Sequence, residues 1–213
     1  MADKALAAGN STADTRYVVY VNLSALLLIG VFAEPLLRHW MGTEFSIGGA
    51  LILQLMALGQ FIDSLTNLPS LVNDGRGHPK VSGLFAFSRA VLGLGLVYAL
   101  VLRFQIVGAA WAHLLSGLVI GLAFIVYVHG RTVPVPLTTL LRRGWGVPML
   151  GATAIAALTA LLNQFTGDSV RHQAALALLA VGLLVAYGWR FVLLGTDRLA
   201  LGRMLRARFA RAA

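Results

Sequence analysis

Polar side chains recur at helical spacing within an otherwise apolar stretch of this 213-residue chain. Intervals of three and four residues place them within roughly a third of a helix circumference, because each residue turns the helix by about 100°. The set is Gln60, Asp63, Ser64, Asn67 and Ser70. Such a stripe cannot face lipid, so it faces other helices or a water-filled cavity. The stripe therefore either joins helices through hydrogen bonds or forms part of a pathway for a polar solute.

Two further polar residues in apolar stretches could share that pathway. Arg89 has a depth similar to that of Asp63, so it can pair with Asp63 or extend its charge to the membrane interface. His113 lies one turn before Ser116. A histidine in such a place is either a buried hydrogen-bonding group or a proton relay. The candidate substrate-pathway residues are Gln60, Asp63, Ser64, Asn67, Arg89 and His113.

No pattern for catalysis, a cofactor or a metal is present. The chain has no cysteine, and its five histidines lack metal-ligand spacing. Neither Gly-x-Ser-x-Gly nor His-Glu-x-x-His occurs, and no phosphate-binding Gly-x-x-x-x-Gly-Lys is found. We therefore expect a protein that is not an enzyme and that has no catalytic residues, no cofactor and no metal site.

The composition predicts an integral membrane protein. Hydrophobic residues make up 58% of the chain, charged residues 12%, and the mean hydropathy is +0.80. An average soluble domain has roughly 45–50% apolar and about 25% charged residues. With so few charges the chain could not cover its apolar surface in water, which excludes a soluble enzyme and a disordered chain alike.

Six apolar stretches reach the length of about 17–25 residues that a transmembrane helix needs. None has the two-residue alternation of a barrel strand, so we expect an all-α, polytopic fold of six transmembrane helices. The expected domain covers 17–195, after a cytoplasmic N-terminal segment 1–16 and before a basic amphipathic tail 196–213. The expected spans are 17–40, 47–72, 81–102, 104–128, 145–162 and 174–194.

The net charge of +9 predicts orientation because its basic residues lie between the spans. With the N-terminus inside, the inner segments carry twelve Lys and Arg residues and the outer loops three: Arg38, Arg103 and Arg171. Both termini are thus expected in the cytoplasm, and the basic tail is expected on anionic lipid headgroups. Basic residues placed this way also argue against a nucleic-acid partner.

Three segments, in order, resemble the C-terminal half of polysaccharide biosynthesis flippases of the multidrug/oligosaccharidyl-lipid/polysaccharide exporter superfamily. Residues 32–45 (FAEPLLRHWMGTEF) resemble the family segment A-x-P-L-L-x-L-W-L-G-x-E-F. Residues 71–80 (LVNDGRGHPK) resemble its L-x-G-x-G-R-P connection. Residues 103–112 (RFQIVGAAWA) resemble its x-F-G-I-V-G-A-A-x-A segment. The resemblance covers about residues 15–130.

This resemblance implies a transporter that moves a lipid-linked oligosaccharide or polysaccharide precursor across the cytoplasmic (inner) membrane. In that family, two six-helix lobes enclose a polar cavity and rock to give alternating access. The six expected spans match only the last part of such a transporter. The resemblance therefore implies a fragment or half, with a partner chain or second copy supplying the missing helices. Asp63, Asn67 and Arg89 are the residues expected to meet the glycan lipid.

Two alternatives stay open. The chain could be a non-transporting membrane scaffold subunit of a polysaccharide-assembly complex, binding its partners through the basic inner face. It could also be a small ion-coupled transporter built as a homodimer, although the polar stripe occurs in only one span and no internal repeat is visible.

Overall fold

The computed structural model describes residues 2–132, 136–165, 167, 169–195 and 197, with side chains from Thr15 onward except Arg143. Every element in this part of the chain is helical. The elements are α1 (Ala2–Val31), α2 (Ala33–Met41), α3 (Thr43–Gly75), α4 (Pro79–Ser116), the π-helical turn η1 (Gly117–Gly121), α5 (Leu122–Arg131), α6 (Leu137–Thr139), η2 (Leu140–Gly146), α7 (Val147–Asn163), α8 (Val170–Tyr187) and η3 (Gly188–Val192).

Several of these helices are long and apolar enough to cross a membrane. Four stretches meet that criterion: Thr43–Gly75, Pro79–Arg131, Leu137–Asn163 and Val170–Val192. A fifth is counted if the bent pair Thr15–Val31 and Ala33–Met41 acts as one span. The all-α class expected from the sequence is therefore confirmed, with four to five stretches long and apolar enough to span a membrane where the sequence predicted six. The expected tail 196–213 lies outside the described residues, apart from Asp197.

The first of the expected spans, 17–40, is bent rather than continuous. Its two helices meet at an angle of 61°, and Phe32 between them has the non-helical dihedrals φ −95° and ψ 13°. Pro35 explains the break, because its ring has no N–H to donate to Val31 and would clash with the Val31 carbonyl in a straight helix. The turn aims α2 away from the axis of α1.

The 53-residue stretch Pro79–Arg131 folds back on itself near its middle. Gln105 has φ 52° and ψ −134°, which interrupts α4 and reverses the chain. A Cβ added to Gly108 would lie 2.3 Å from the Leu100 carbonyl oxygen, so only glycine allows the returning segment to pack this closely. The predicted turn at Arg103 thus lies two residues later in the structure.

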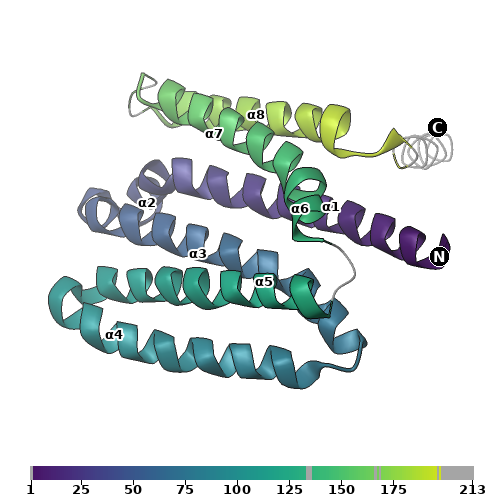
Figure 1. The fold of residues 1–213 in the computed structure, drawn as a ribbon. Coiled ribbons are helices and arrows are strands. Elements are labelled where there is room, and N and C mark those ends of the chain that lie inside the picture. The colour runs from purple at the N-terminus through teal and green to yellow at the C-terminus, as the bar shows by residue number, and fades with distance from the viewer. Residues whose placement is uncertain (1, 133–135, 166, 168, 196, 198–213) are drawn as a thin grey trace, which may run out of the picture.

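The helices run up and down in two groups around α1 (Figure 1). On one side of α1 lie α7 and α8; on the other lie α3, both arms of α4 and α5. The α3–α4 turn, the end of α5 and the start of α1 lie at one end of the bundle. The opposite end holds α2, the turn at Gln105 and the α7–α8 connection. A hydrogen bond from the Arg76 guanidinium to the Thr132 carbonyl joins the α3–α4 turn to the end of α5.

Glycines bring α7 and α8 into close contact with their neighbours. A Cβ on Gly151 would lie 2.0 Å from Tyr187 Cζ, and one on Gly188 would lie 2.7 Å from Tyr20 Cε1. The Tyr187 hydroxyl donates to the Val147 carbonyl at 2.9 Å, which ties α8 to α7. Each aromatic ring thus occupies the space that a side chain would fill, as expected where small residues let helices approach.

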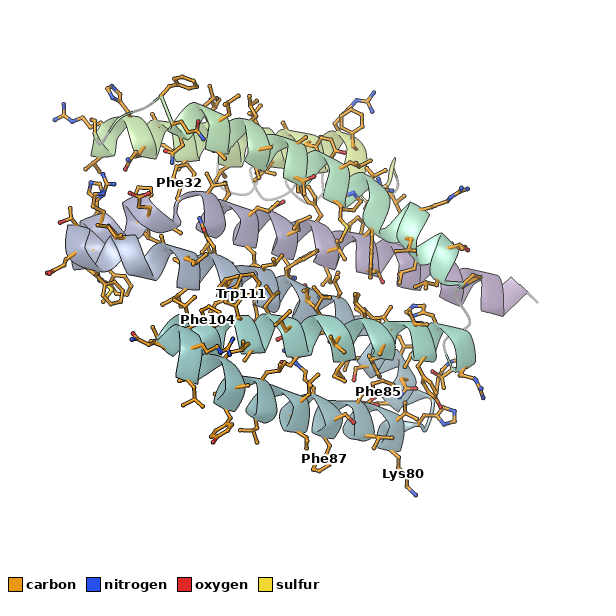
Figure 2. The ribbon with its side chains drawn as sticks, turned by 60° about the vertical axis from the view of Figure 1, so that its left-hand side comes forward. Phe32, Lys80, Phe85, Phe87, Phe104 and Trp111 are labelled. Carbon is orange, nitrogen blue, oxygen red and sulfur yellow. The ribbon has the colours of Figure 1, made fainter. Side chains whose placement is uncertain are left out.

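The outer surface is apolar. Phe87 on α4 points away from the bundle and is 69% exposed, whereas Phe85, two residues earlier, points toward α5 (Figure 2). Along α4 the same outer face carries exposed Leu84, Val91, Tyr98 and Leu102. A continuous apolar face of this kind would be anomalous in water and is normal against lipid.

Candidate transport cavity

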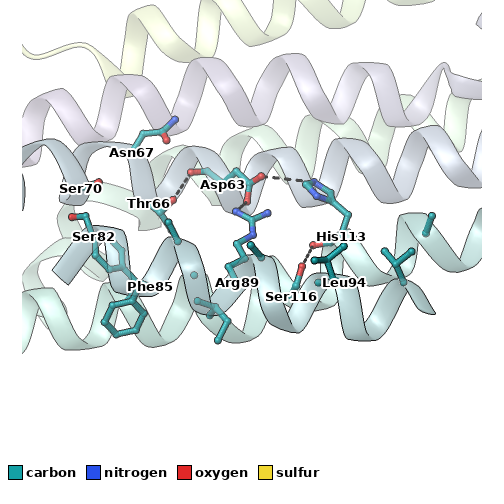
Figure 3. Close-up of a pocket in the computed structure, with 18 residues that line it drawn as sticks. Asp63, Thr66, Asn67, Ser70, Ser82, Phe85, Arg89, Leu94, His113 and Ser116 are labelled. Atoms are coloured by element: carbon teal, nitrogen blue, oxygen red, sulfur yellow. Dashed lines mark hydrogen bonds and ion pairs between the residues drawn. The ribbon is translucent and has the colours of Figure 1, made fainter. Parts of the chain in front are cut away.

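A cavity of about 790 Å³ lies between α3, α4 and the η1–α5 segment (Figure 3). Its polar lining comes mainly from two helices: Asp63, Thr66, Asn67 and Ser70 on α3, and Ser82 and Arg89 on α4. The remaining lining includes the apolar side chains of Leu94, Val97, Ile120 and Phe124. A pocket with mostly apolar walls and a few convergent polar groups is typical of a binding site for an organic molecule.

The cavity exists because the inner face of α4 is built from small residues. Ala86, Ala90 and Gly93 line it, and none fills the space between α4 and α3. Arg89 lies between them and is the residue whose side chain reaches across the gap. One charged side chain therefore bridges the space between α3 and this stretch of α4.

Asp63 is the centre of the charged cluster. Arg89 Nη1 lies 2.5 Å from Asp63 Oδ1, and His113 Nε2 lies 3.7 Å from Asp63 Oδ2 (Figure 3). The side chains of Asp63, Arg89 and His113 are only 21%, 25% and 32% exposed. Of the two alternatives that the sequence left open for Arg89, the structure shows the pairing. One carboxylate thus connects α3 to both arms of α4.

Two glycines make room for this cluster. A Cβ on Gly59 would lie 2.5 Å from His113 Cδ2, so the imidazole packs directly against the backbone of α3. A Cβ on Gly117 would lie 3.1 Å from Arg89 Nη2. Gly117 also begins the π-helical turn η1, a type of irregularity that is frequent at functional sites.

The polar lining is concentrated toward one end of the cavity. Ser70 and Ser82 lie close to the α3–α4 turn, and the Asp63 cluster lies farther along. Beyond the cluster the α4 lining is Leu94 and Val97. Near the polar end, Phe85 contacts Phe124 edge to face with 5.3 Å between ring centroids. The cavity is thus amphipathic along its length and suits a ligand with a polar head and an apolar chain.

Gln60, the first residue of the predicted stripe, lines a second hollow. This hollow, of about 320 Å³, lies between α1, α3 and the second arm of α4, and Leu26, Met56 and His113 also line it. Since His113 also lines the larger cavity, the two hollows are adjacent. Five of the six candidate residues, all except Ser64, therefore line one hollow or the other.

Ser64 does not belong to either hollow. It is buried, and its hydroxyl donates to the Phe61 carbonyl of its own helix at 2.7 Å. Conversely, the sequence prediction did not include Thr66 and Ser82, which line the cavity. Ser82 could have been found, because it lies seven residues before Arg89 and so on the same helical face. The Thr66 hydroxyl is committed to the Asp63 carbonyl at 2.8 Å.

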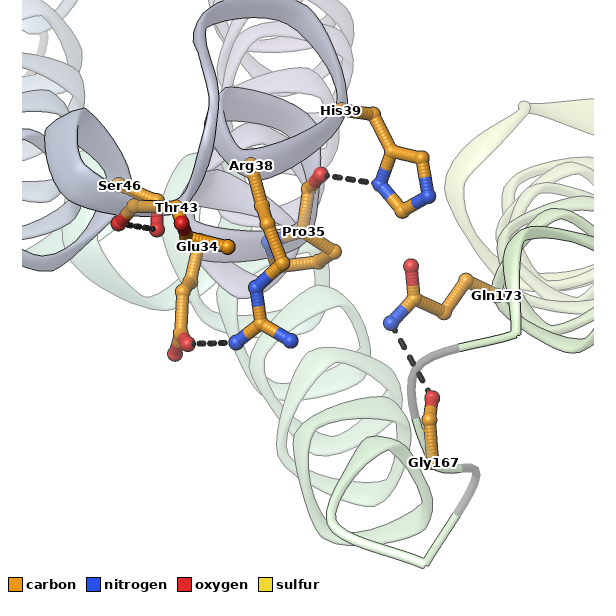
Figure 4. Close-up of polar contacts among 8 residues, drawn as sticks. All are labelled: Glu34, Pro35, Arg38, His39, Thr43, Ser46, Gly167 and Gln173. Atoms are coloured by element: carbon orange, nitrogen blue, oxygen red, sulfur yellow. Dashed lines mark hydrogen bonds and ion pairs between the residues drawn. The ribbon is translucent and has the colours of Figure 1, made fainter.

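A second polar cluster lies at the opposite end of the bundle and has a structural explanation. Glu34 pairs with Arg38 one turn later, and His39 Nδ1 lies 2.8 Å from the Pro35 carbonyl (Figure 4). Gly42 between α2 and α3 has φ +93°, and the Ser46 hydroxyl caps the Thr43 carbonyl at 2.8 Å. These contacts stabilise the α2–α3 turn.

No group of three or more His, Asp or Glu side chains in the described residues could hold a metal ion. The candidate site is therefore a cavity with one ion pair, one imidazole, and several hydroxyl and amide groups. Comparisons of the chain with family models, with curated proteins and with solved structures find no match.

Proposed function

We propose that this protein is a flippase-like transporter that moves a lipid-linked oligosaccharide or polysaccharide precursor across the cytoplasmic membrane without chemical change to it. The observation that carries the proposal is the cavity with the Asp63, Arg89 and His113 cluster in the middle of apolar helices. Charged groups at such a depth cost free energy, and they typically mark substrate or ion pathways.

The shape of the cavity supports this substrate class. Hydroxyl and amide groups gather at its polar end, where sugar hydroxyls can exchange hydrogen bonds with them. Arg89 can turn from Asp63 to a phosphate oxygen, since guanidinium groups bind carboxylates and phosphates through the same donors. The apolar end around Leu94 and Val97 suits the lipid chain.

The proposed topology has six crossings with both termini in the cytoplasm. The bent first span counts once, and the Pro79–Arg131 stretch counts twice because it reverses at Gln105. The turn that contains Arg76 and the end of α5 at Arg131 lie at the same end of the bundle. That clustering of basic residues supports a cytoplasmic assignment for this end.

The backbone at Gln105 supports the family resemblance. The family segment x-F-G-I-V-G-A-A-x-A has glycine where this chain has Gln105. Here the φ of +52° is one that glycine adopts without strain. The second glycine of the segment corresponds to Gly108, where the close approach to Leu100 admits no side chain.

The test is a leaflet-exchange assay. The full chain is reconstituted into liposomes that contain a fluorescent polyprenyl-diphosphate sugar in both leaflets, and dithionite bleaches the label in the outer leaflet. We expect the protein to make the inner-leaflet label accessible, and Asp63→Asn or Arg89→Gln to slow this exchange. Glu34→Gln is the matched control, because its ion pair with Arg38 lies outside the cavity. Exchange no faster than in protein-free liposomes would overturn the proposal.

A further inference from the structure

His113 lies where the two hollows meet. Its side chain lines both of them, whereas Asp63 and Arg89 line the larger one. In the described part of the chain neither ring nitrogen makes a hydrogen bond, and Nε2 is 3.7 Å from Asp63 Oδ2, beyond hydrogen-bond reach. The sequence left two interpretations open for this residue, and the one that needs a hydrogen bond between helices has none here.

The Asp63 carboxylate lies between two basic side chains. Arg89 Nη1 faces Oδ1 at 2.5 Å, and the imidazole of His113 faces Oδ2. While His113 is neutral, the arginine and the carboxylate cancel and the cluster carries no net charge. A proton on His113 adds one positive charge, and histidine is the side chain that gains or loses a proton between about pH 5 and 8. The charge of the cluster is therefore set by a single proton.

No other side chain in the described lining can offset that added charge. Around His113, α3 contributes Asp63 and the first arm of α4 contributes Arg89. From α1 the second hollow receives Leu26 and Ile29, and η1 and α5 line the cavity with apolar residues alone. Asp63 already balances Arg89. A protonated His113 thus leaves one positive charge without an acid at mid-span, where an unbalanced charge is costly.

We propose that a proton and a phosphate anion bind to this cluster together, the proton on His113 and the anion on Arg89. The anion supplies the negative charge that the protonated cluster lacks. The imidazolium also attracts Asp63 through Oδ2, which weakens the hold of the carboxylate on Arg89 and frees the guanidinium for a phosphate oxygen. Binding linkage is reciprocal, so the proton and the anion raise each other's affinity by the same factor.

The two hollows give the two ligands separate approaches. The proton can reach the imidazole from the second hollow, which Gln60 also lines, while the anion occupies the larger cavity beside Arg89 and Asn67. This linkage rests on the proposed function, because the transported glycolipid supplies the phosphate. It adds a condition to that function: the cavity binds its cargo while His113 is protonated and releases the cargo when His113 loses the proton.

The test is calorimetric titration of the full chain, purified in detergent, with dibutyl phosphate. This diester keeps one negative charge throughout the pH range used, so only the protein changes its protonation. At one pH, heats measured in buffers of different ionisation enthalpy give the number of protons taken up with each anion. We expect uptake between about pH 6 and 8, and an affinity about tenfold higher at about pH 5.5 than at about pH 8.

His113→Asn should bind the diester equally weakly at both pH values and take up no protons. His129→Asn is the matched control, because this histidine of α5 lines neither hollow and its Nδ1 lies 2.9 Å from the Ile125 carbonyl. The control should retain both the proton uptake and the pH dependence. Proton uptake that persists in His113→Asn would assign the proton to another group and overturn the proposal.

The wild-type chain alone also decides the question, so the test does not depend on the folding of a variant. Binding of the diester without proton uptake, or no binding at any pH, would overturn the linkage. The leaflet-exchange assay then shows whether transport fails as well, because exchange at a rate independent of pH would leave the proposed function standing. Linked uptake without leaflet exchange would support the role of the cluster and reject the transporter.

Discussion

Gly117 lies directly beneath the guanidinium of Arg89, at a place where a Cβ would stand 3.1 Å from Nη2. The same Cβ would stand 3.3 Å from Asp63 Oδ1, so the ion pair packs directly against the backbone of Gly117. The π-helical turn that starts at Gly117 brings this backbone to α3 and α4. The contact of the three segments at this point is thus built around a charge pair and the absence of a side chain.

Gly117→Val should destabilise the protein, because its two methyl groups would displace the Arg89 guanidinium from Asp63. We expect a loss of about 1–3 kcal/mol, the usual cost of overpacking, measured by SDS-induced unfolding in mixed micelles. Gly95→Val is the matched control, since nothing lies within 4 Å of its added Cβ. Equal losses for the two variants would rule out the steric explanation.

A double-mutant cycle should show that Asp63 and Arg89 are coupled. Asp63→Asn leaves the Arg89 charge at mid-depth without an acidic partner. Arg89→Gln leaves the Asp63 carboxylate without a basic partner. We expect the double variant to be more stable than the sum of the single losses predicts, with a coupling free energy of about 1–2 kcal/mol. The exposed Glu34–Arg38 pair should give less than about 0.5 kcal/mol. A coupling for Asp63–Arg89 as small as that would mean that water screens the cavity pair fully.

Gln105→Gly should stabilise the protein. Its φ of 52° with ψ −134° lies in a region that glycine occupies readily and that other residues occupy at a cost of about 1–3 kcal/mol. Removal of the side chain relieves this strain, and the gain is reduced by the greater entropy of glycine in the unfolded chain. We therefore expect a gain of about 1 kcal/mol in the same unfolding assay. Gln105→Val should lower stability, and a gain for this variant would contradict the strain argument.

Gly151→Ala should weaken the packing of α7 on α8. Its methyl group would overlap the Tyr187 ring, whose Cζ lies 2.0 Å from the new Cβ position. We expect a loss of about 1–3 kcal/mol. Gly182→Ala on α8, which has nothing within 4 Å, should instead be neutral or stabilising because alanine favours helix. Comparison of the two midpoints of unfolding tests this, and a stable Gly151→Ala protein would show that Tyr187 can move aside at little cost.

The sequence was sufficient to predict the helical membrane class and most of the cavity lining on α3. Periodicity explains this success, because helical geometry alone decides which residues of α3 share a face with Asp63. Ser64 shows the limit of that argument. It lies at one edge of the stripe, and only the packing around α3 decides that this edge is buried.

Other features depended on backbone details that hydropathy does not contain. The break at Phe32 follows from Pro35, and a hydropathy average over residues 17–40 gives no sign of it. The width of the cavity depends on Ala86, Ala90 and Gly93. In the sequence these are ordinary apolar residues, and only the structure shows that they lie opposite α3. The positive φ at Gln105 is not a preference of glutamine at all.

The pairing of Asp63 with Arg89 also has an electrical consequence. The two formal charges cancel, so a movement that carries both side chains together through the membrane transfers no net charge. Separation of one unit charge across the full membrane would couple to voltage by about 2.3 kcal/mol per 100 mV. While the pair is preserved, Asp63 and Arg89 therefore contribute no voltage dependence of their own, and the voltage dependence of a transport cycle would come from the charge of the cargo.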